Sequence, residues 1–241
     1  MYKTAQQATE YIEQLAPKIS GCQARVFLAV PFTAIISTVA AAKQTKIVIG
    51  AQNMCDAHEG AFTGEVASLM LKEAGASFVL LGHSERRRYF GETDEMVHRK
   101  VVRALQDDIQ PVLCIGETFE DHEEKRTRDV LQQQIKKALT KVPKKSVSSL
   151  ILAYEPIWAI GTGRIATPKI VHETHSFCRK CLEEHFGDHA EDIPILYGGS
   201  VKADLVKELV SQKDVDGVLV GGASLEPESL TAIVQQCEGV R

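Results

Sequence analysis

Short apolar segments rich in β-branched residues alternate with longer segments of helical periodicity along the whole 241-residue chain. Seven segments fit strands, at residues 25–30, 47–53, 78–82, 111–116, 150–155, 193–197 and 217–220. Most of them are continuously apolar, as expected of parallel strands that are covered on both faces. This alternation predicts a parallel sheet with right-handed crossovers, which an open doubly wound sheet and a closed barrel both satisfy.

The chain begins with a helical segment that no strand precedes. Thr4 and Gln7 have the spacing of a capping box, and Pro17 is expected to end this first helix. Its apolar face is formed by Ala8, Ile12 and Leu15. The pattern as a whole therefore predicts seven strands and eight helices, as if one β/α unit lacked its strand.

Composition narrows the class of protein. The net charge of −4 provides no global basic field, so nucleic acid and anionic membranes are unexpected partners. No apolar run approaches the ~18 residues that span a bilayer, so we expect a cytoplasmic protein. Two small domains would also fit this length, but no linker or composition shift divides the chain, and we predict one domain over residues 1–241.

The six cysteines lack the spacing of a disulfide framework, and reduced thiols are expected. Cys178 and Cys181 form a C-x-x-C, and His172 and His175 continue the same three-residue step, which raises the question of a metal site. On a helix each such step lags the turn by about 60°, so the four side chains spiral around it and cannot face one ion. We expect no metal.

The strongest candidate for chemistry lies at residues 153–163. Parallel barrels carry their active sites at the carboxyl ends of strands, and Glu155 ends the fifth predicted strand. An apolar flap, Pro156-Ile157-Trp158, follows it, and Gly161 and Gly163 come next. A flap that closes over the carboxylate would exclude water and raise its basicity. A proton-transfer site is predicted; a solvated carboxylate at a strand corner is the alternative.

A second candidate follows the third predicted strand. His83 stands there with Glu85, Arg86 and Arg87 close behind it. A histidine at this rim can polarise a carbonyl if a backbone N–H fixes its tautomer, and Glu85 offers a second polar partner. A purely structural histidine is the alternative. Arg86 and Arg87 fit either a salt-bridge network or a subunit interface.

Glycine pairs follow the last two predicted strands. They occur in Gly198-Gly199-Ser200 and Gly221-Gly222. Glycines there allow a ligand to approach the backbone, and N–H groups at the start of a following helix favour an anion. We predict a phosphate site, with two tight turns as the alternative. A base, an electrophile, a flap and a phosphate site together fit proton abstraction next to the carbonyl of a small phosphorylated substrate.

These motifs, in this order, resemble those of the triosephosphate isomerase family over nearly the whole chain. The matching segments are residues 154–163, 82–87 and 197–200, with Gly221-Gly222. The resemblance implies a (β/α)8 barrel and the interconversion of dihydroxyacetone phosphate and glyceraldehyde 3-phosphate, in glycolysis and gluconeogenesis. It implies no metal or organic cofactor. A lyase or synthase of another phosphate-binding barrel class would leave the flap unexplained.

The resemblance also implies residue roles. Glu155 is the base, neutral His83 stabilises the enediolate, and Glu85 helps to order the polar cluster. The phosphate is bound by the main-chain N–H groups of Gly161, Ser200, Gly221 and Gly222. Cys114 matches a structural cysteine of the family, not a nucleophile. A homodimer is implied, in which the loop from Gln52 to Glu65, with Phe62 and Thr63, reaches into the partner.

One family motif has no counterpart among these residues. Family members carry a first strand that ends in Asn-x-Lys directly before a methionine, and Met1 matches that methionine. The strand and its catalytic lysine are therefore expected upstream of this sequence, and Lys3 does not replace that lysine. Two interpretations follow: an active isomerase whose first strand precedes Met1, and a catalytically impaired or inactive phosphate-binding homologue.

Overall fold

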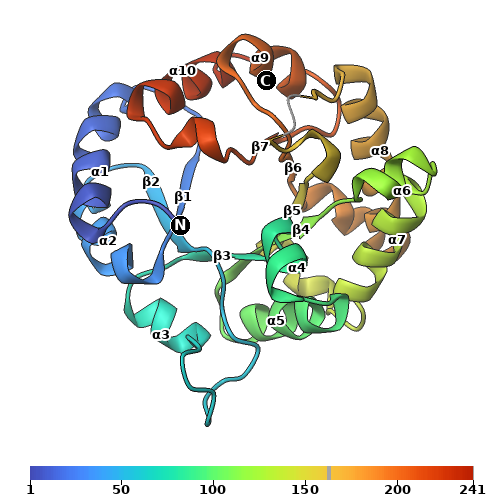
Figure 1. Ribbon diagram of the computed structural model, residues 1–241, viewed down its shortest axis with the longest axis horizontal. Helices are drawn as coiled ribbons and strands as arrows, with labels where there is room; N and C mark the ends of the chain where they lie inside the picture. The colour runs from blue at the N-terminus through green and yellow to red at the C-terminus, as the bar shows by residue number, and fades with distance from the viewer. Residues whose placement is uncertain (162–163, 241) are drawn as a thin grey trace.

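A curled sheet of parallel strands, surrounded by helices, forms the centre of the computed structural model, which describes residues 1–161 and 164–240 (Figure 1). The strands are β1 (Val26–Val30), β2 (Ile47–Ala51), β3 (Phe78–Leu81), β4 (Gln110–Ile115), β5 (Ile151–Tyr154), β6 (Ile195–Tyr197) and β7 (Gly217–Val218). They pair in sequence order, so that β1 and β7 are the edges of the sheet. All seven predicted strands are confirmed. Their observed ends differ from the predicted ends by at most a few residues.

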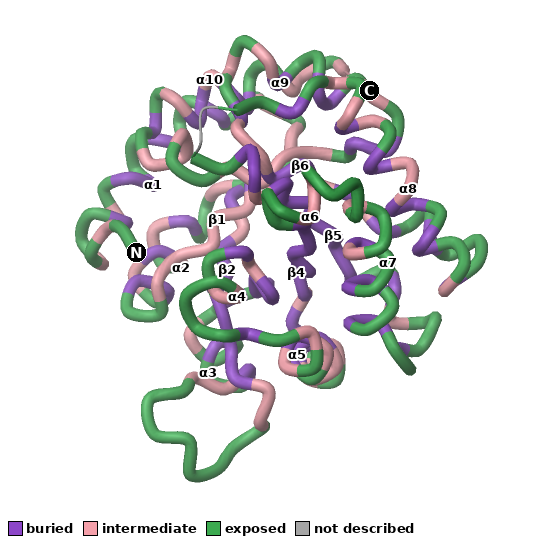
Figure 2. The backbone as a smooth tube through the Cα atoms, turned by 45° about the vertical axis from the view of Figure 1, so that its right-hand side comes forward, coloured by how far each residue is buried: buried purple, intermediate pink, exposed green. Residues whose placement is uncertain are grey.

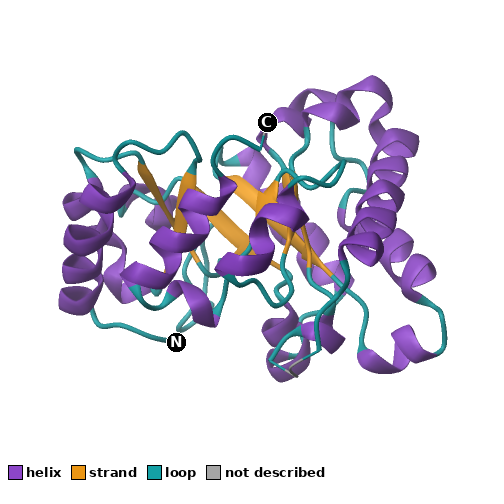
Figure 3. Cartoon of the chain, turned by 90° about the horizontal axis from the view of Figure 1, so that it is seen from above, coloured by secondary structure: helices purple, strands orange, loops and turns teal. Residues whose placement is uncertain are grey.

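The helices lie on the outside of the curled sheet (Figure 3). The α-helices are α1 (Ala5–Ile19), α2 (Ile35–Ala42), α3 (Ser68–Glu73), α4 (Ser84–Phe90), α5 (Asp94–Gln106), α6 (Phe119–Glu123), α7 (Thr127–Ala138), α8 (Pro168–Phe186), α9 (Ala203–Val210) and α10 (Pro227–Cys237). The 3-10 helices are η1 (Phe32–Ala34), η2 (Lys144–Ser149), η3 (Ile157–Ala159), η4 (Gly187–Asp192) and η5 (Gly222–Ser224). None of the described helices is long and apolar enough to cross a membrane.

The prediction of eight helices missed two short ones among the described residues. Eight of the ten α-helices follow the expected alternation with the strands, while α4 and α6 are extra turns just after β3 and β4. His83 caps α4 and Thr118 caps α6, and both helices are too short to show an apolar period. These two extra helices lie just beyond the carboxyl ends of β3 and β4.

Burial on both faces explains the continuously apolar strands. Inside the barrel a cluster of alternating residues, Phe78, Leu80, Val112, Cys114, Ile151 and Ala153, packs together. The intervening residues, such as Leu81, Leu113 and Leu152, pack against the helices in the main core. Strands β3, β4 and β5 are thus almost wholly buried, whereas the edge strands β1 and β7 are only partly buried (Figure 2).

The first helix confirms its predicted start and corrects its predicted end. The Thr4 hydroxyl accepts from Gln7 N, and the Gln7 side chain accepts from Thr4 N, so that the capping box is complete. Pro17, however, lies inside α1, which runs on to Ile19. Proline removes its own N–H from the helix and crowds the carbonyl of the residue four positions earlier. Here that residue is exposed Glu13, whose carbonyl water can reach, so the helix continues past Pro17. The prediction that Pro17 ends the helix was therefore wrong.

A long exposed loop extends from the body between β2 and α3 (Figures 1 and 2). Its base is closed by a hydrogen bond of 2.8 Å from Cys55 N to the carbonyl of Val66. Near its tip Gly60 and Gly64 have φ values of +143° and +94°, which side chains rarely adopt. Phe62, between them, is 54% exposed. The loop is therefore an ordered projection from the body of the protein, with an exposed aromatic ring near its tip.

Candidate active site

Glu155 follows the last residue of β5 and lies buried at the carboxyl end of the barrel, 2% exposed. One oxygen, Oε1, is 3.0 Å from Nε2 of His83 and 3.5 Å from the Ser84 hydroxyl. The other, Oε2, accepts the Ser84 backbone N–H at 3.2 Å. The carboxylate predicted from the sequence is thus buried and already paired, rather than solvated at a strand corner. Ser84 is a partner that sequence analysis did not assign.

Two glycines make room for Glu155. A methyl group on Gly116 would lie 1.9 Å from the carbonyl oxygen of Glu155, and one on Gly198 would lie 2.9 Å from its Cγ. Any larger residue at either position would displace the carboxylate or its backbone. Gly198 was predicted to serve phosphate binding, but in the structure it is a packing partner of Glu155.

His83 reaches Glu155 from the start of α4. Its Nδ1 accepts the backbone N–H of Glu85 at 3.3 Å, which leaves the proton on Nε2, the atom that faces Glu155. Burial lowers the pKa of His83, but the hydrogen bond and charge of Glu155, helped by Glu85 and Glu92, outweigh it and raise the pKa. The raised pKa therefore depends chiefly on the carboxylate staying where it is.

Glu85 contributes mainly through its backbone. Its side chain is 72% exposed, and its carboxylate lies 3.9 Å from His83 Nδ1. The two arginines that follow form a salt-bridge network, one of the two alternatives given by the sequence. Arg86 pairs with Glu92, and Arg87 donates to the Gly82 carbonyl at 2.8 Å and to Asp94 at 2.5 Å.

A buried network behind the site was not predicted. Glu92 accepts the backbone N–H of Gly82 at 3.1 Å and pairs with Lys100, whose ammonium group also donates to Asn53 at 2.8 Å. Asn53 lies just beyond β2 and Gly82 just beyond β3, so the network ties two neighbouring strand ends together. Its members are far apart in the sequence, and no local pattern indicated it.

The flap after Glu155 is held by Glu117, a fully buried acid just beyond β4. Its Oε1 accepts the indole N–H of Trp158 at 2.7 Å and the hydroxyl of Tyr154 at 3.1 Å. Burial raises the pKa of Glu117 despite these donors, and burial also raises the pKa of Tyr154 well above its usual value. The flap is thus fastened at its first turn, which is η3.

The remaining flap residues meet one predicted phosphate ligand. The Ser200 hydroxyl donates to the carbonyl of Ala159 at 2.7 Å, so this side chain contacts the flap. Gly161 is exposed and has a φ of +67°, a backbone conformation that favours glycine. Gly163 lies outside the described residues.

The second glycine pair follows β7, the strand that neighbours β6 in the sheet. Gly221 and Gly222 are exposed, and a methyl group on either would meet nothing within 4 Å. The short turn η5 starts there, in place of the predicted helix start, and its N–H groups lie close to the surface. The open space beside these two residues suits a ligand that approaches the backbone.

Cysteines contribute no reactive group to the site. Cys114 is fully buried inside the barrel, and desolvation raises its pKa well above the usual value, so its thiol stays protonated. Burial likewise raises the pKa of Cys181 to about 11. On α8, His172 and His175 contact the carbonyls of Lys213 and Asp214.

Comparison with known proteins assigns the family. The family model described as triosephosphate isomerase matches residues 1–237. Triosephosphate isomerase of Protochlamydia amoebophila is 48% identical over 97% of this chain and 89% of its own length. That of Caldanaerobacter subterraneus is 44% identical, over 97% of this chain and 95% of its own. A crystal structure of triosephosphate isomerase from Bartonella henselae superposes with a TM-score of 0.90 at 34% identity, covering 98% of this chain and 95% of that one. The curled sheet is accordingly that of a TIM barrel, and the chain belongs to the triosephosphate isomerase family.

Proposed function

We propose that the protein interconverts dihydroxyacetone phosphate and glyceraldehyde 3-phosphate through an enediolate, with Glu155 as the base and His83 as the electrophile. One observation carries the proposal: a buried carboxylate and an imidazole N–H lie 3.0 Å apart at the carboxyl ends of β5 and β3, directly before a fastened flap. A base and a hydrogen-bond donor so close together can act on adjacent atoms of one small substrate.

The chemistry assigns separate tasks to the two side chains. Glu155 removes a proton from the carbon next to the carbonyl and returns it to the neighbouring carbon. Negative charge then develops on the carbonyl oxygen, and the Nε2–H of His83 donates to it. To reach the substrate the carboxylate has to leave His83 and Ser84. Its departure removes the main influence that raises the pKa of His83, which favours the neutral imidazole during turnover.

The phosphate of the substrate is assigned to backbone N–H groups at Gly161, Ser200, Gly221 and Gly222. The exposed pair Gly221 and Gly222 leaves open space for an anion, and Ser200 already touches the flap through Ala159. Glu85 is assigned a supporting role, since its backbone N–H orients His83. Binding through N–H groups at one rim suits a small dianion in a protein with no excess of basic residues.

We also propose a homodimer, one domain over residues 1–241 and a cytoplasmic location. Support for the dimer comes from the loop between Gln52 and Glu65, which projects from the body with Phe62 largely exposed (Figure 1). Large apolar side chains are exposed elsewhere as well, among them Ile36, Leu69, Met70, Tyr89 and Phe90. Support for the location comes from the six cysteines, which are free thiols.

A coupled assay tests the isomerase. Wild-type protein is expected to convert glyceraldehyde 3-phosphate at a rate that Glu155→Gln lowers by roughly 10³-fold or more, because the base is lost. His83→Gln should lower kcat by roughly 10²-fold or more, because one donor to the oxyanion is lost. As a matched control, exposed Glu123→Gln should leave the rate unchanged. Equal turnover in wild type and Glu155→Gln would refute the assignment.

The competing candidate is a phosphate-binding homologue that does not turn over. One observation favours it: in the described part of the chain no lysine contacts His83 or Glu155, and the ammonium group of Lys3 lies over the ring of Tyr11. Unmatched charge on an enediolate would slow the reaction by about 10²–10³-fold or more. Binding of a triose phosphate without conversion in the assay would select this candidate.

A further inference from the structure

Gln134 is a buried glutamine on the inner face of α7, where its neighbours Leu131 and Ile135 belong to the main core. Both ends of its amide are bonded to the backbone of a single residue, Gly116. Its Oε1 accepts the Gly116 N–H at 2.8 Å, and its Nε2 donates to the Gly116 carbonyl at 3.1 Å. A buried polar side chain that is matched at both ends in this way fixes the position of the peptide groups that it bonds.

Gly116 lies just beyond β4, at a level of the barrel where pairing with β3 has already ended. In the described part of the chain, the last paired residues of these two strands are Leu81 and Leu113. Gly116 is buried, so water is not at hand to bond its peptide groups. The side chain of Gln134 therefore takes the place of a neighbouring strand and bonds both of them.

The backbone at Gly116 is in direct contact with the backbone of Glu155. The carbonyl of Ile115 accepts the Glu155 N–H at 2.7 Å, and a methyl group on Gly116 would lie 1.9 Å from the Glu155 carbonyl oxygen. The two segments are thus packed as closely as a glycine allows. A displacement of Gly116 would move the main chain of Glu155, and with it the carboxylate that faces His83.

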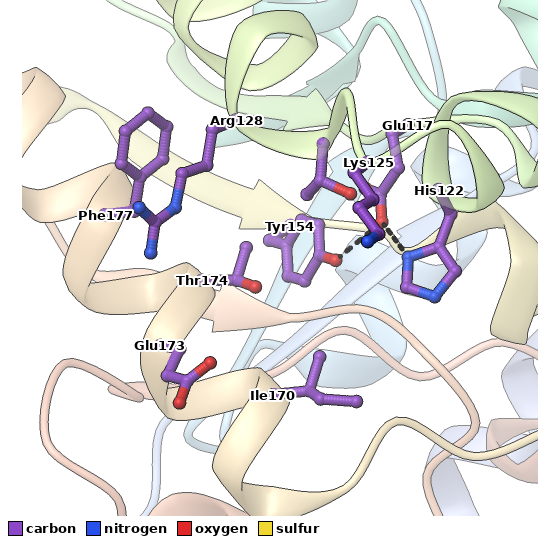
Figure 4. Close-up of a pocket in the computed structure, with 10 residues that line it drawn as sticks. Glu117, His122, Lys125, Arg128, Tyr154, Ile170, Glu173, Thr174 and Phe177 are labelled. Atoms are coloured by element: carbon purple, nitrogen blue, oxygen red, sulfur yellow. Dashed lines mark hydrogen bonds and ion pairs between the residues drawn. The ribbon is translucent and has the colours of Figure 1, made fainter.

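The next residue, Glu117, joins the same turn to the chain on both sides of Glu155. Its carbonyl accepts the Ile157 N–H at 3.2 Å, and its carboxylate accepts the indole N–H of Trp158 at 2.7 Å. The same carboxylate accepts the hydroxyl of Tyr154 at 3.1 Å (Figure 4). The turn that Gln134 bonds is therefore in contact with the residues before and after the carboxylate, as well as with its backbone.

We propose that Gln134 is a positioning residue for Glu155: by fixing the peptide groups of Gly116 from α7, it sets where the carboxylate stands relative to His83. The inference rests on the proposed function, in which Glu155 is the base. A base has to be held in a narrow range of positions, and a misplacement of about 1 Å can lower a rate by about 100-fold. Gln134 acts on turnover through Gly116 and does not touch the reacting atoms.

Gln134→Met tests this role, because methionine keeps the length of the side chain and forms neither hydrogen bond. The kcat should fall about ten-fold or more, whereas KM should change less than about three-fold. Substrate affinity should be less affected because Ser200 and Gly221-Gly222, which are assigned to the phosphate, follow other strands. Gln133→Met, at an exposed glutamine of the same helix, is the matched control and should keep the kcat of wild type.

A second control separates positioning from a general loss of stability. Ile19→Ala removes buried apolar volume in α1 and should lower the free energy of unfolding without lowering the kcat of the folded protein. If the fall in kcat of Gln134→Met is no greater than that of Ile19→Ala, the positioning role is overturned.

Hydrogen exchange in the ligand-free protein tests the hold on Gly116 without relying on any activity. In Gln134→Met, exchange at the Gly116 N–H should become about ten-fold faster or more relative to exchange at Leu113 in the same strand, whereas Gln133→Met should leave this ratio unchanged. An unchanged ratio in Gln134→Met would overturn the proposal. If the ratio rises but wild type never turns over triose phosphate, the proposed function fails while the hold of Gln134 on Gly116 is supported.

Discussion

Gly198 and Glu155 are in such close contact that a methyl group on the glycine would lie 2.9 Å from Cγ of the carboxylate side chain. Gly198→Ala should therefore push Glu155 away from His83 and lower kcat/KM by roughly ten-fold or more, because a small misplacement of a base is costly. Unfolding by urea should show some loss of stability as well, since the methyl group would also lie 3.2 Å from the backbone carbonyl oxygen of Tyr154. Gly21→Ala, where a methyl group meets nothing within 4 Å, is the control for both measurements. An unchanged kcat/KM in Gly198→Ala would contradict this account.

Glu117→Gln should make stability less dependent on pH. Burial raises the pKa of Glu117 above its ordinary 4.5, so the folded state holds this proton more tightly than the unfolded state does. Its contribution to stability is thus greatest below about pH 4.5 and is lost as pH rises through the raised pKa. Glutamine keeps an oxygen for Trp158 and Tyr154 without ionising. In urea unfolding, the free energy of unfolding of Glu117→Gln should rise relative to that of wild type as pH goes from acidic to neutral. If the two proteins show the same dependence of unfolding free energy on pH, the prediction is wrong.

His175 should contribute the opposite pH dependence. It is buried in α8, and desolvation lowers its pKa from 6.5 to about 4. Its contribution to stability is present above pH 6.5 and is lost as pH falls through about 4, because the unfolded state then binds the proton more readily. Relative to His175→Gln, wild type should lose on the order of 3 kcal/mol of unfolding free energy over that range. Exposed His189→Gln is the control, and its unfolding free energy should show the same pH dependence as wild type. The prediction fails if His175→Gln also shows the pH dependence of wild type.

Phe62→Ser should weaken the proposed dimer. The ring is 54% exposed at the tip of a projecting loop, and an aromatic anchor of this kind contributes roughly 2 kcal/mol or more to an interface. Sedimentation velocity over a dilution series should show the dimer dissociating at a concentration at least about ten-fold higher than for wild type. Tyr2→Ser, which removes an even more exposed aromatic residue outside the loop, should have no effect. A wild type that stays monomeric at every concentration would end the dimer proposal.

Much of the fold could be predicted because the strands are buried on both faces. Continuous apolar runs such as residues 78–82 mark where the strands lie, and the helices between the strands imply that the strands are parallel. The same logic placed His83 and Glu155 at one rim, since both follow strand ends. Pro17 and the two short helices were misjudged for a different reason. Where a helix ends, or whether a short helix forms, depends on about one turn of backbone. Hydrophobic periodicity gives no information over so few residues.

The hydrogen-bonding and packing partners of the site residues could not be predicted from the sequence. Glu117 and Gln52 both follow a strand end, yet only tertiary structure decides which of them turns inward. The contacts of Gly116 and Gly198 with Glu155 join residues of three neighbouring strand ends, and a glycine pair gives no hint of the side chain that it accommodates. Hydrogen bonds between distant residues depend on side-chain direction, which periodicity does not encode.

The strand order of the sheet also bears on how the chain reaches this fold. Each strand from β1 to β7 pairs with the strand that precedes or follows it in the chain. Among the strands of the described residues no pairing has to wait for a distant segment, and each β/α unit can dock on the one before it. The almost wholly buried strands β3 to β5 can thus pair with one another before the flap and the last glycine turns take their places.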